Sequence, residues 1–176
     1  MKKKILSVLL ILAIFAIPAF SEVDIYGFYG PALFNTEGYM PDWVGAVGAG
    51  VNYEMNTDTV NWLIGGRFEV TRMVSIQLLA LETGIGKNFS VSENSLIDLQ
   101  TKFAFGLVNF LTANITDFTV LAQWKHKTRS LPAVGVGLQV GWFIAHDDPS
   151  YYAVTVSVPV YVTWTIKTKS DKALYE

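Results

Sequence analysis

The sequence contains no cysteine and only two histidines among its 176 residues. The absence of cysteine excludes disulfide bridges, zinc–thiolate sites, cysteine nucleophiles and the lipid-modified cysteine of a lipoprotein. Two histidines are too few for a histidine-rich metal site. Charged residues make up only 16% of the chain, and 13 Lys and Arg stand against 15 Asp and Glu. This balance excludes the basic excess of a nucleic-acid-binding protein.

Long hydrophobic runs are also scarce, although 51% of the residues are hydrophobic. The sequence has one long unbroken apolar run, residues 5–20 at the N-terminus, so the chain is not a helical multi-span membrane protein. It is too apolar to be disordered. Five Trp, eight Tyr and eleven Phe add a high aromatic content. We therefore expect the hydrophobicity to lie in short alternating segments.

The first 21 residues resemble an export signal. Residues 2–4 are lysines, residues 5–17 form an apolar stretch, and Ala19-Phe20-Ser21 matches a small-x-small cleavage site. An uncleaved anchor helix is the alternative, but Pro18 interrupts a run that is already short for a span. We expect cleavage after Ser21, a single barrel domain over residues 22–167, and a polar tail over residues 168–176.

The remaining chain alternates with a period of two. Between residues 151 and 167 the even positions carry Tyr, five Val, Trp and Ile, and the odd positions are mostly small or polar. Successive side chains of a β-strand point to opposite faces, and no helix presents this pattern. The sequence predicts eight such strands, of which the first is ambiguous because both faces carry aromatic residues: residues 23–34, 43–54, 59–70, 73–83, 97–110, 115–125, 133–145 and 151–167.

Short connections rich in Asn, Asp, Gly and Pro separate these strands and leave no room for crossover helices. The prediction is an all-β, eight-stranded antiparallel up-and-down barrel. In the fourth strand we assign Leu78 and Ala80 to the apolar outer face, and Ser75 and Gln77 to the polar inner face. The segment after Thr83 is not assigned to that strand, and residues 88–95 are expected to form a turn.

Alternation fits a transmembrane barrel with its apolar face outward or a soluble barrel with that face inward. Three features favour the transmembrane reading. The polar faces are small and little charged, whereas soluble exteriors are roughly 25–35% charged. The mid-strand charges balance, with Arg67, Lys102, Lys125 and Lys167 against Glu54, Glu69, Asp98 and Asp117. The tryptophans lie on apolar faces toward strand ends, as in the aromatic girdles of membrane barrels.

Two sets of residues follow from this reading. The polar network expected in the lumen comprises Arg67, Glu69, Gln77, Asp98, Gln100, Lys102, Asp117, Gln123 and Lys125. The aromatic girdle expected at the membrane surfaces comprises Trp43, Trp62, Trp124, Trp142, Trp164 and Tyr152. The row of Gly135, Gly137 and Gly141 is expected to leave one wall of the lumen bare.

With an export signal, eight strands and an apolar exterior, the chain resembles the small eight-stranded bacterial outer-membrane barrels of the OmpX and OmpW type. The resemblance is architectural and covers the chain after the signal. It implies a monomer in the bacterial outer membrane, with membrane lipid and the barrel-insertion machinery as partners and no nucleic acid. The implied role is structural or a narrow small-solute path, without catalysis, cofactor or metal. A polar tail after the last strand and short outer connections depart from the family pattern.

Two alternatives stay open. One is a periplasmic lipocalin-like barrel that binds an apolar ligand inside. The other is a lipid A-modifying outer-membrane enzyme, because some barrels of this kind resemble the chain and use a His and a Ser, or a His, an acidic residue and a Ser. Its candidate residues are His146, Asp147, Asp148 and Ser150, although a polar turn explains them better. His126 lies in a basic segment with Lys125, Lys127 and Arg129, which we interpret as a solvated turn, with a basic cluster that meets lipid phosphates as the alternative.

Overall fold

The computed structural model describes residues 22–36, 42–57, 59–71, 76–108, 113–127, 131–145 and 152–167. These residues form strands in the following order: β1 (Glu22–Thr36), β2 (Asp42–Asn56), β3 (Asn61–Thr71), β4 (Ile76–Ser90), β5 (Ser95–Val108), β6 (Ala113–His126), β7 (Ala133–Ala145), β8 (Tyr152–Ser157) and β9 (Val160–Lys167). Within this described part, no helix has the length and apolar character needed to cross a membrane.

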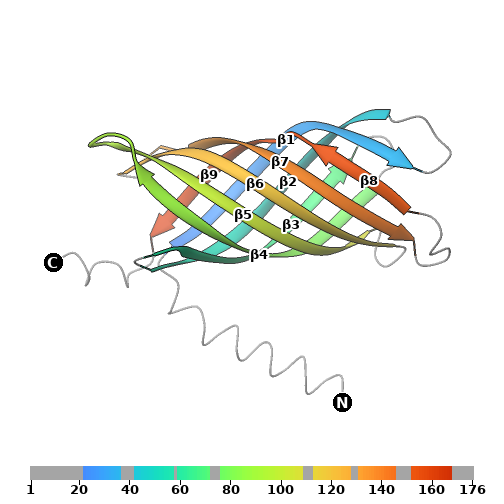
Figure 1. The fold of residues 1–176 in the computed structure, drawn as a ribbon, viewed down its shortest axis with the longest axis horizontal. Helices are drawn as coiled ribbons and strands as arrows, with labels where there is room; N and C mark the ends of the chain where they lie inside the picture. The colour runs from blue at the N-terminus through green and yellow to red at the C-terminus, as the bar shows by residue number, and fades with distance from the viewer. Residues whose placement is uncertain are drawn as a thin grey trace, which may run out of the picture.

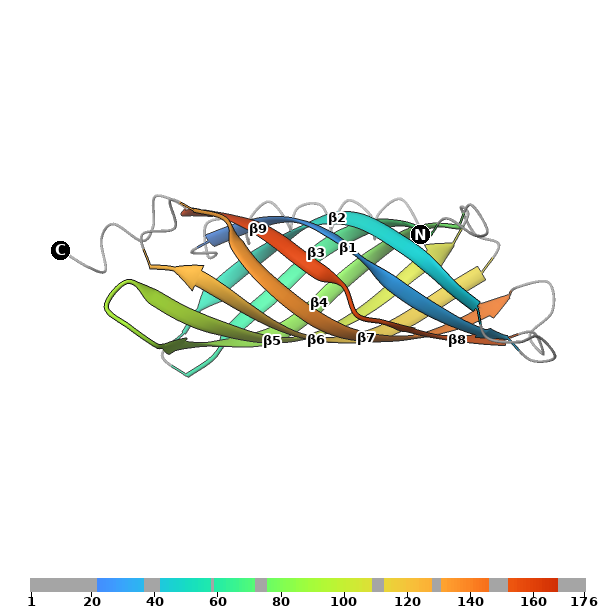
Figure 2. The ribbon, with the colours of Figure 1, turned by 90° about the horizontal axis from the view of Figure 1, so that it is seen from above.

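The strands form one closed antiparallel sheet. From β2 to β8 each strand pairs with the next one along the chain. β1 pairs with β2 along one edge and with β8 and β9 along the other, which closes the sheet into a barrel. Figures 1 and 2 show the strands inclined around a common axis. Because β8 and β9 are two halves of one strand, the predicted eight-stranded up-and-down barrel is confirmed.

The two ends of the barrel differ in what they carry. Glu22, Lys167 and the connections leaving β2, β4 and β6 lie at one end, which we call the terminal end. The connections leaving β1, β3, β5 and β7 lie at the other, which we call the opposite end.

Two prolines interrupt the ladder that closes the barrel. The Val158 N–H donates to the Pro31 carbonyl at 3.2 Å, and the Gly137 N–H donates to the Pro159 carbonyl at 2.9 Å. Neither proline has an N–H to return the bond, which explains the gap between β8 and β9. The register with β1 is the same on both sides of this gap, so the strand continues without a shift.

The apolar face of the strands points outward. In β7, Val134, Val136, Leu138 and Val140 are 42–52% exposed, whereas the residues between them are buried inside the barrel. The same alternation runs through the other strands. Among the exposed residues of the described strands, Lys87 and Lys167 carry charge, and both lie close to the terminal end.

The faces of β4 are the reverse of our prediction. Leu78 and Ala80 are buried inside the barrel, whereas Leu79 and Leu81 point outward, with Leu81 76% exposed. The strand also continues to Ser90, beyond the turn expected from residue 88. The reversal has a simple cause, since the start of β4 carries leucines on both faces. The side chain of Gln77, assigned to the lumen from this strand, lies outside the described residues.

Candidate functional site

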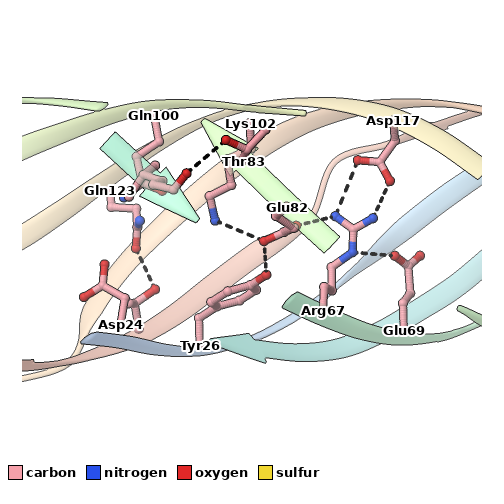
Figure 3. A network of polar contacts seen from close by, with 12 residues as sticks. Asp24, Tyr26, Arg67, Glu69, Glu82, Thr83, Gln100, Lys102, Asp117 and Gln123 are labelled. Atoms are coloured by element: carbon pink, nitrogen blue, oxygen red, sulfur yellow. Dashed lines mark hydrogen bonds and ion pairs between the residues drawn. The ribbon is translucent and has the colours of Figure 1, made fainter. Parts of the chain in front are cut away.

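The barrel interior is the candidate functional site because it collects the buried charge of the chain. Arg67 of β3 lies at its centre and is 2% exposed. Its Nη1 lies 2.9 Å from Oε1 of Glu82 on β4, and its Nε lies 3.4 Å from Oε2 of Glu69. Its Nη2 donates to Asp117 of β6, across the barrel (Figure 3). One guanidinium therefore ties three strands together through three carboxylates.

A second cation lies next to this group. Lys102 of β5 places its Nζ 3.9 Å from Oε2 of Glu82 and 4.4 Å from the centre of the Tyr26 ring. The Tyr26 hydroxyl donates to the same Glu82 oxygen at 2.5 Å, as Figure 3 shows. The Tyr161 ring lies 5.7 Å from Lys102 on another side. Two aromatic faces thus take the place of water around an ammonium group.

A third cation, Lys125 of β6, organises the interior nearer the terminal end. Its Nζ lies 2.7 Å from Asp98, 3.1 Å from Asp24 and 3.7 Å from Glu54. Neutral groups also donate to these carboxylates, to the oxygen that faces Lys125 in Asp98 and to the other oxygen in Glu54 and Asp24. Gln100 donates to Asp98 at 2.7 Å, and the donors to Glu54 and Asp24 are Asn61 at 2.6 Å and Thr165 at 2.5 Å.

The interior charge is acidic, whereas we expected it to be balanced. Three cations, Arg67, Lys102 and Lys125, face seven buried carboxylates: Glu22, Asp24, Glu54, Glu69, Glu82, Asp98 and Asp117. Lys167, counted among the inward-facing basic residues, is exposed at the end of β9. Each interior carboxylate is removed from water, so its contacts with a cation or hydrogen-bond donor offset part of a large desolvation cost.

The glycine row does not leave a bare wall, which corrects a further expectation. An added side-chain carbon at Gly137 would lie 3.0 Å from the Tyr161 ring, and one at Gly135 would lie 2.6 Å from the Gln123 side chain. An added carbon at Gly141 would overlap the Thr155 side chain. The glycines therefore mark places where larger inward-facing side chains from neighbouring strands fill the lumen.

Apart from Gln77, the residues proposed for the lumen have described side chains, and all of these are buried inside the barrel: Arg67, Glu69, Asp98, Gln100, Lys102, Asp117, Gln123 and Lys125. The structure brings them together in the three groups described above and in a Thr163–Gln123 hydrogen bond of 2.7 Å. Sequence reasoning missed Asp24, Tyr26 and Glu82. Glu82 could have been assigned to the lumen from the sequence, because Gly84 and Gly86 continue the small inner face of β4 beyond Thr83, where the predicted strand ends.

Four proposed girdle residues project outward with similar exposure, from 48% to 53%: Trp62, Trp124, Trp142 and Trp164. Trp142 lies toward the opposite end of the barrel, and the other three lie toward the terminal end. The side chains of Trp43 and Tyr152 lie outside the described residues, although their backbones belong to β2 and β8.

The candidate residues of the catalytic alternative, His146, Asp147, Asp148 and Ser150, lie outside the described part of the chain, as does Arg129. His126 ends β6 in a half-buried position and Lys127 is exposed beside it, but Lys125 points into the barrel and does not join a surface basic cluster. Within the described ranges no group of His, Asp and Glu residues is arranged to hold a metal ion.

Comparison with known proteins supports the fold. No protein-family model matches the chain, and no curated protein sequence matches it significantly. Neisserial surface protein A superposes with a TM-score of 0.52 and 7% identity, over 80% of this chain and 96% of that one. DynF, from the dynemicin biosynthesis pathway of Micromonospora chersina, superposes with a TM-score of 0.55 and 12% identity, over 85% and 82%. Ail, the attachment invasion locus protein of Yersinia pestis, gives 0.40 and 14%, over 82% and 99%.

These likenesses concern the fold alone. The chain has the antiparallel barrel fold of the small outer-membrane barrels that it resembles. Because the superpositions on Neisserial surface protein A and on DynF are of similar quality, the chemistry of the two faces has to distinguish between possible functions.

Proposed function

We propose that this protein is an integral outer-membrane β-barrel with a filled lumen and a structural, non-catalytic role. The observation that carries this proposal is the chemistry of the outer face. Large apolar side chains cover it, while the residues between them are buried and mostly polar or small. The bilayer core is the solvent that favours such a surface, because a transmembrane barrel presents an apolar band to lipid and keeps its polar groups inside.

The distribution of charge on the outer face also supports a lipid environment. The charged side chains on the exposed outer face of the described strands, Lys87 and Lys167, lie near the terminal end, where a membrane surface would be. A soluble exterior carries roughly 25–35% charged residues spread over its whole height. Trp62, Trp124 and Trp164 lie at the same end, as expected for an interfacial girdle.

A lipocalin-like ligand-binding role, the main alternative, requires an apolar and open interior. This interior instead holds ten buried charged side chains. Rings and amide groups also occupy the space beside its glycines. An apolar ligand would have to displace ion pairs that have no other source of solvation, so the filled interior favours a membrane barrel without a ligand cavity.

The closed sheet supports a monomer, since a barrel has no free strand edge to pair with a second copy. The family resemblance adds membrane lipid and the barrel-insertion machinery as proposed partners and the bacterial outer membrane as the proposed location.

The direct test is fractionation of cells that express the full chain, followed by electrophoresis with and without heating. We expect the protein in the outer-membrane fraction, with a folded band that migrates differently from the heated one. A protein that stays soluble without detergent, or that is found in the periplasm, would contradict the proposal.

A further inference from the structure

A hollow of about 280 Å³ opens on the outer wall of the barrel. It spans β3 to β6. Lys102 is the one lining residue that belongs to the salt-bridge groups, and its side chain points into the barrel, away from the hollow. Its walls and floor are formed by Trp62 of β3, Thr83 and Ile85 of β4, Thr101 and Phe103 of β5, and Phe118 of β6.

The hollow arises from the strand register. Thr83 lies between Ile64 and Phe103 on the two neighbouring strands. Thr101 lies in the same way between Ile85 and Val120. Two small side chains are therefore surrounded by large ones, and they form the floor of a depression with aromatic and aliphatic walls.

The floor offers little polarity to an occupant. The Thr83 hydroxyl donates to the Leu63 carbonyl at 3.2 Å, so its hydrogen is already bound to the backbone. Trp62, Phe103 and Phe118 are each about half exposed and present their rings around the floor. The chemistry favours a flexible hydrocarbon chain over a polar headgroup.

We propose that this hollow seats one acyl chain of a membrane lipid, which enters beside Trp62 from the leaflet at the terminal end. The inference rests on the proposed membrane location, because the hollow is continuous with the apolar outer wall. Trp62 is the second residue of β3, close to the terminal end, whereas Phe118 lies near the middle of β6. The hollow therefore runs from the girdle toward the centre of the wall, as a chain anchored at the membrane surface does.

An acyl chain is already surrounded by hydrocarbon when it enters the hollow, so what it gains there is closer van der Waals packing against side chains on several sides. A chain seated along several residues is therefore held longer than a chain that lies against a flat part of the wall. This difference gives a measurable contrast between Trp62 and a tryptophan of equal exposure outside the hollow. Trp164, 53% exposed and also near the terminal end, is that control.

The experiment uses two variants that each retain one tryptophan, Trp62 or Trp164, with the others replaced by Phe. Both are reconstituted in phosphatidylcholine vesicles whose acyl chains carry bromine at mid-chain, and folding is checked by heat modifiability. We expect steeper quenching of Trp62 than of Trp164. Thr101→Phe, which fills the floor of the hollow, should lower the quenching of Trp62 to the level of Trp164. Leu138→Phe, on the outer face of β7, should leave it unchanged.

Equal quenching of the two tryptophans, or quenching of Trp62 that Thr101→Phe does not change, would overturn the acyl-chain site and leave the membrane barrel intact. Protection of Trp62 together with a cross-linked dimer would also overturn it, because a second copy would then cover the hollow. If neither tryptophan is quenched in a correctly folded sample, the membrane location itself fails.

Discussion

Three buried cations contact most of the buried carboxylates of the barrel: Arg67, Lys102 and Lys125. A buried ion pair is costly to desolvate, and its removal in full is often neutral. The loss of one partner is different, since it leaves the remaining charges without compensation. At the residue scale the three cations are therefore the most sensitive positions in the interior.

The substitution Arg67→Met tests this sensitivity. It keeps much of the side-chain volume but leaves Glu69 and Asp117 without a cation and Glu82 with Lys102 alone, 3.9 Å away. We expect a loss of about 3–5 kcal/mol in the free energy of unfolding. Urea titration of the folded, heat-modifiable form in lipid vesicles measures it.

Lys167→Met is the matched control, because Lys167 is exposed at the end of β9. Its effect should stay within about 0.5 kcal/mol. The neutral pair Glu82→Gln and Asp117→Asn, combined with Arg67→Met, should restore part of the lost stability. If Arg67→Met is no more harmful than Lys167→Met, the ion-pair group does not stabilise the barrel.

Leu138→Arg tests the outer face at a single position. Leu138 lies near the middle of β7 and is 50% exposed. A charge facing the middle of the bilayer should cost about 2–4 kcal/mol. On a soluble surface the same change should be within about 0.5 kcal/mol. The urea midpoint of Leu138→Arg, compared with that of Leu138→Val, distinguishes the two solvents.

At the scale of the strand, glycines and aromatic rings are matched across the interior. An added carbon at Gly48 of β2 would overlap the Phe28 ring of β1 and would lie 2.6 Å from the backbone oxygen of Phe68. Gly27, by contrast, has its nearest neighbour, the Gly48 oxygen, at 3.8 Å. Small residues therefore stand where a neighbouring strand supplies a ring.

The pair gives a direct prediction. Gly48→Ala should destabilise the barrel by about 1–3 kcal/mol, because neither a packed ring nor a backbone carbonyl can move freely. Gly27→Ala should change stability much less, since its new methyl group meets ordinary contact distances. Similar urea midpoints for both variants would show that the interior near Phe28 is looser than the structure indicates.

The strand scale also explains what could be predicted from the sequence. In β7 the outer face holds Val, Leu and Trp and the inner face holds Gly and Gln, so the direction of each side chain follows from alternation alone. At the start of β4 both faces carry leucine, and the decision depends on Glu82 and the glycines after it. In β1, Tyr26 and Phe28 are aromatic but point inward, which alternation of hydrophobicity does not reveal.

The partners within the interior were harder to predict than the faces. Arg67 and Asp117 are 50 residues apart, and Asp24 and Lys125 are 101 apart. Outside β1 and the start of β4 the polar face of each strand is visible in the sequence, but the register and the strand tilt decide which residues meet across the lumen. For those strands the sequence therefore predicts which side chains enter the barrel and leaves their pairing to the three-dimensional structure.

At the scale of the whole molecule, the described interior carries groups of different character along the barrel axis. The Lys125 group lies toward the terminal end, and the Arg67 and Lys102 groups follow with the rings of Tyr26 and Tyr161. Toward the opposite end the interior holds an apolar cluster of Leu78, Ala80, Ala104, Ala113 and Ile115. An ion that crosses the barrel would have to pass both a charged and an apolar barrier.

Planar-bilayer recording of the purified protein tests this arrangement. An eight-stranded barrel has an interior only wide enough for its side chains, so we expect no conductance from the wild type. Lys102→Ala removes a side chain that lies between two rings and Glu82, and a small conductance should appear if this group is the narrowest barrier. Leu138→Ala, on the outer wall, serves as the control and should stay silent.

A large, steady conductance in the wild type would contradict the filled lumen and would favour a solute path. A silent Lys102→Ala would instead place the main barrier at the apolar cluster, where Leu78→Ala becomes the substitution that should open a path.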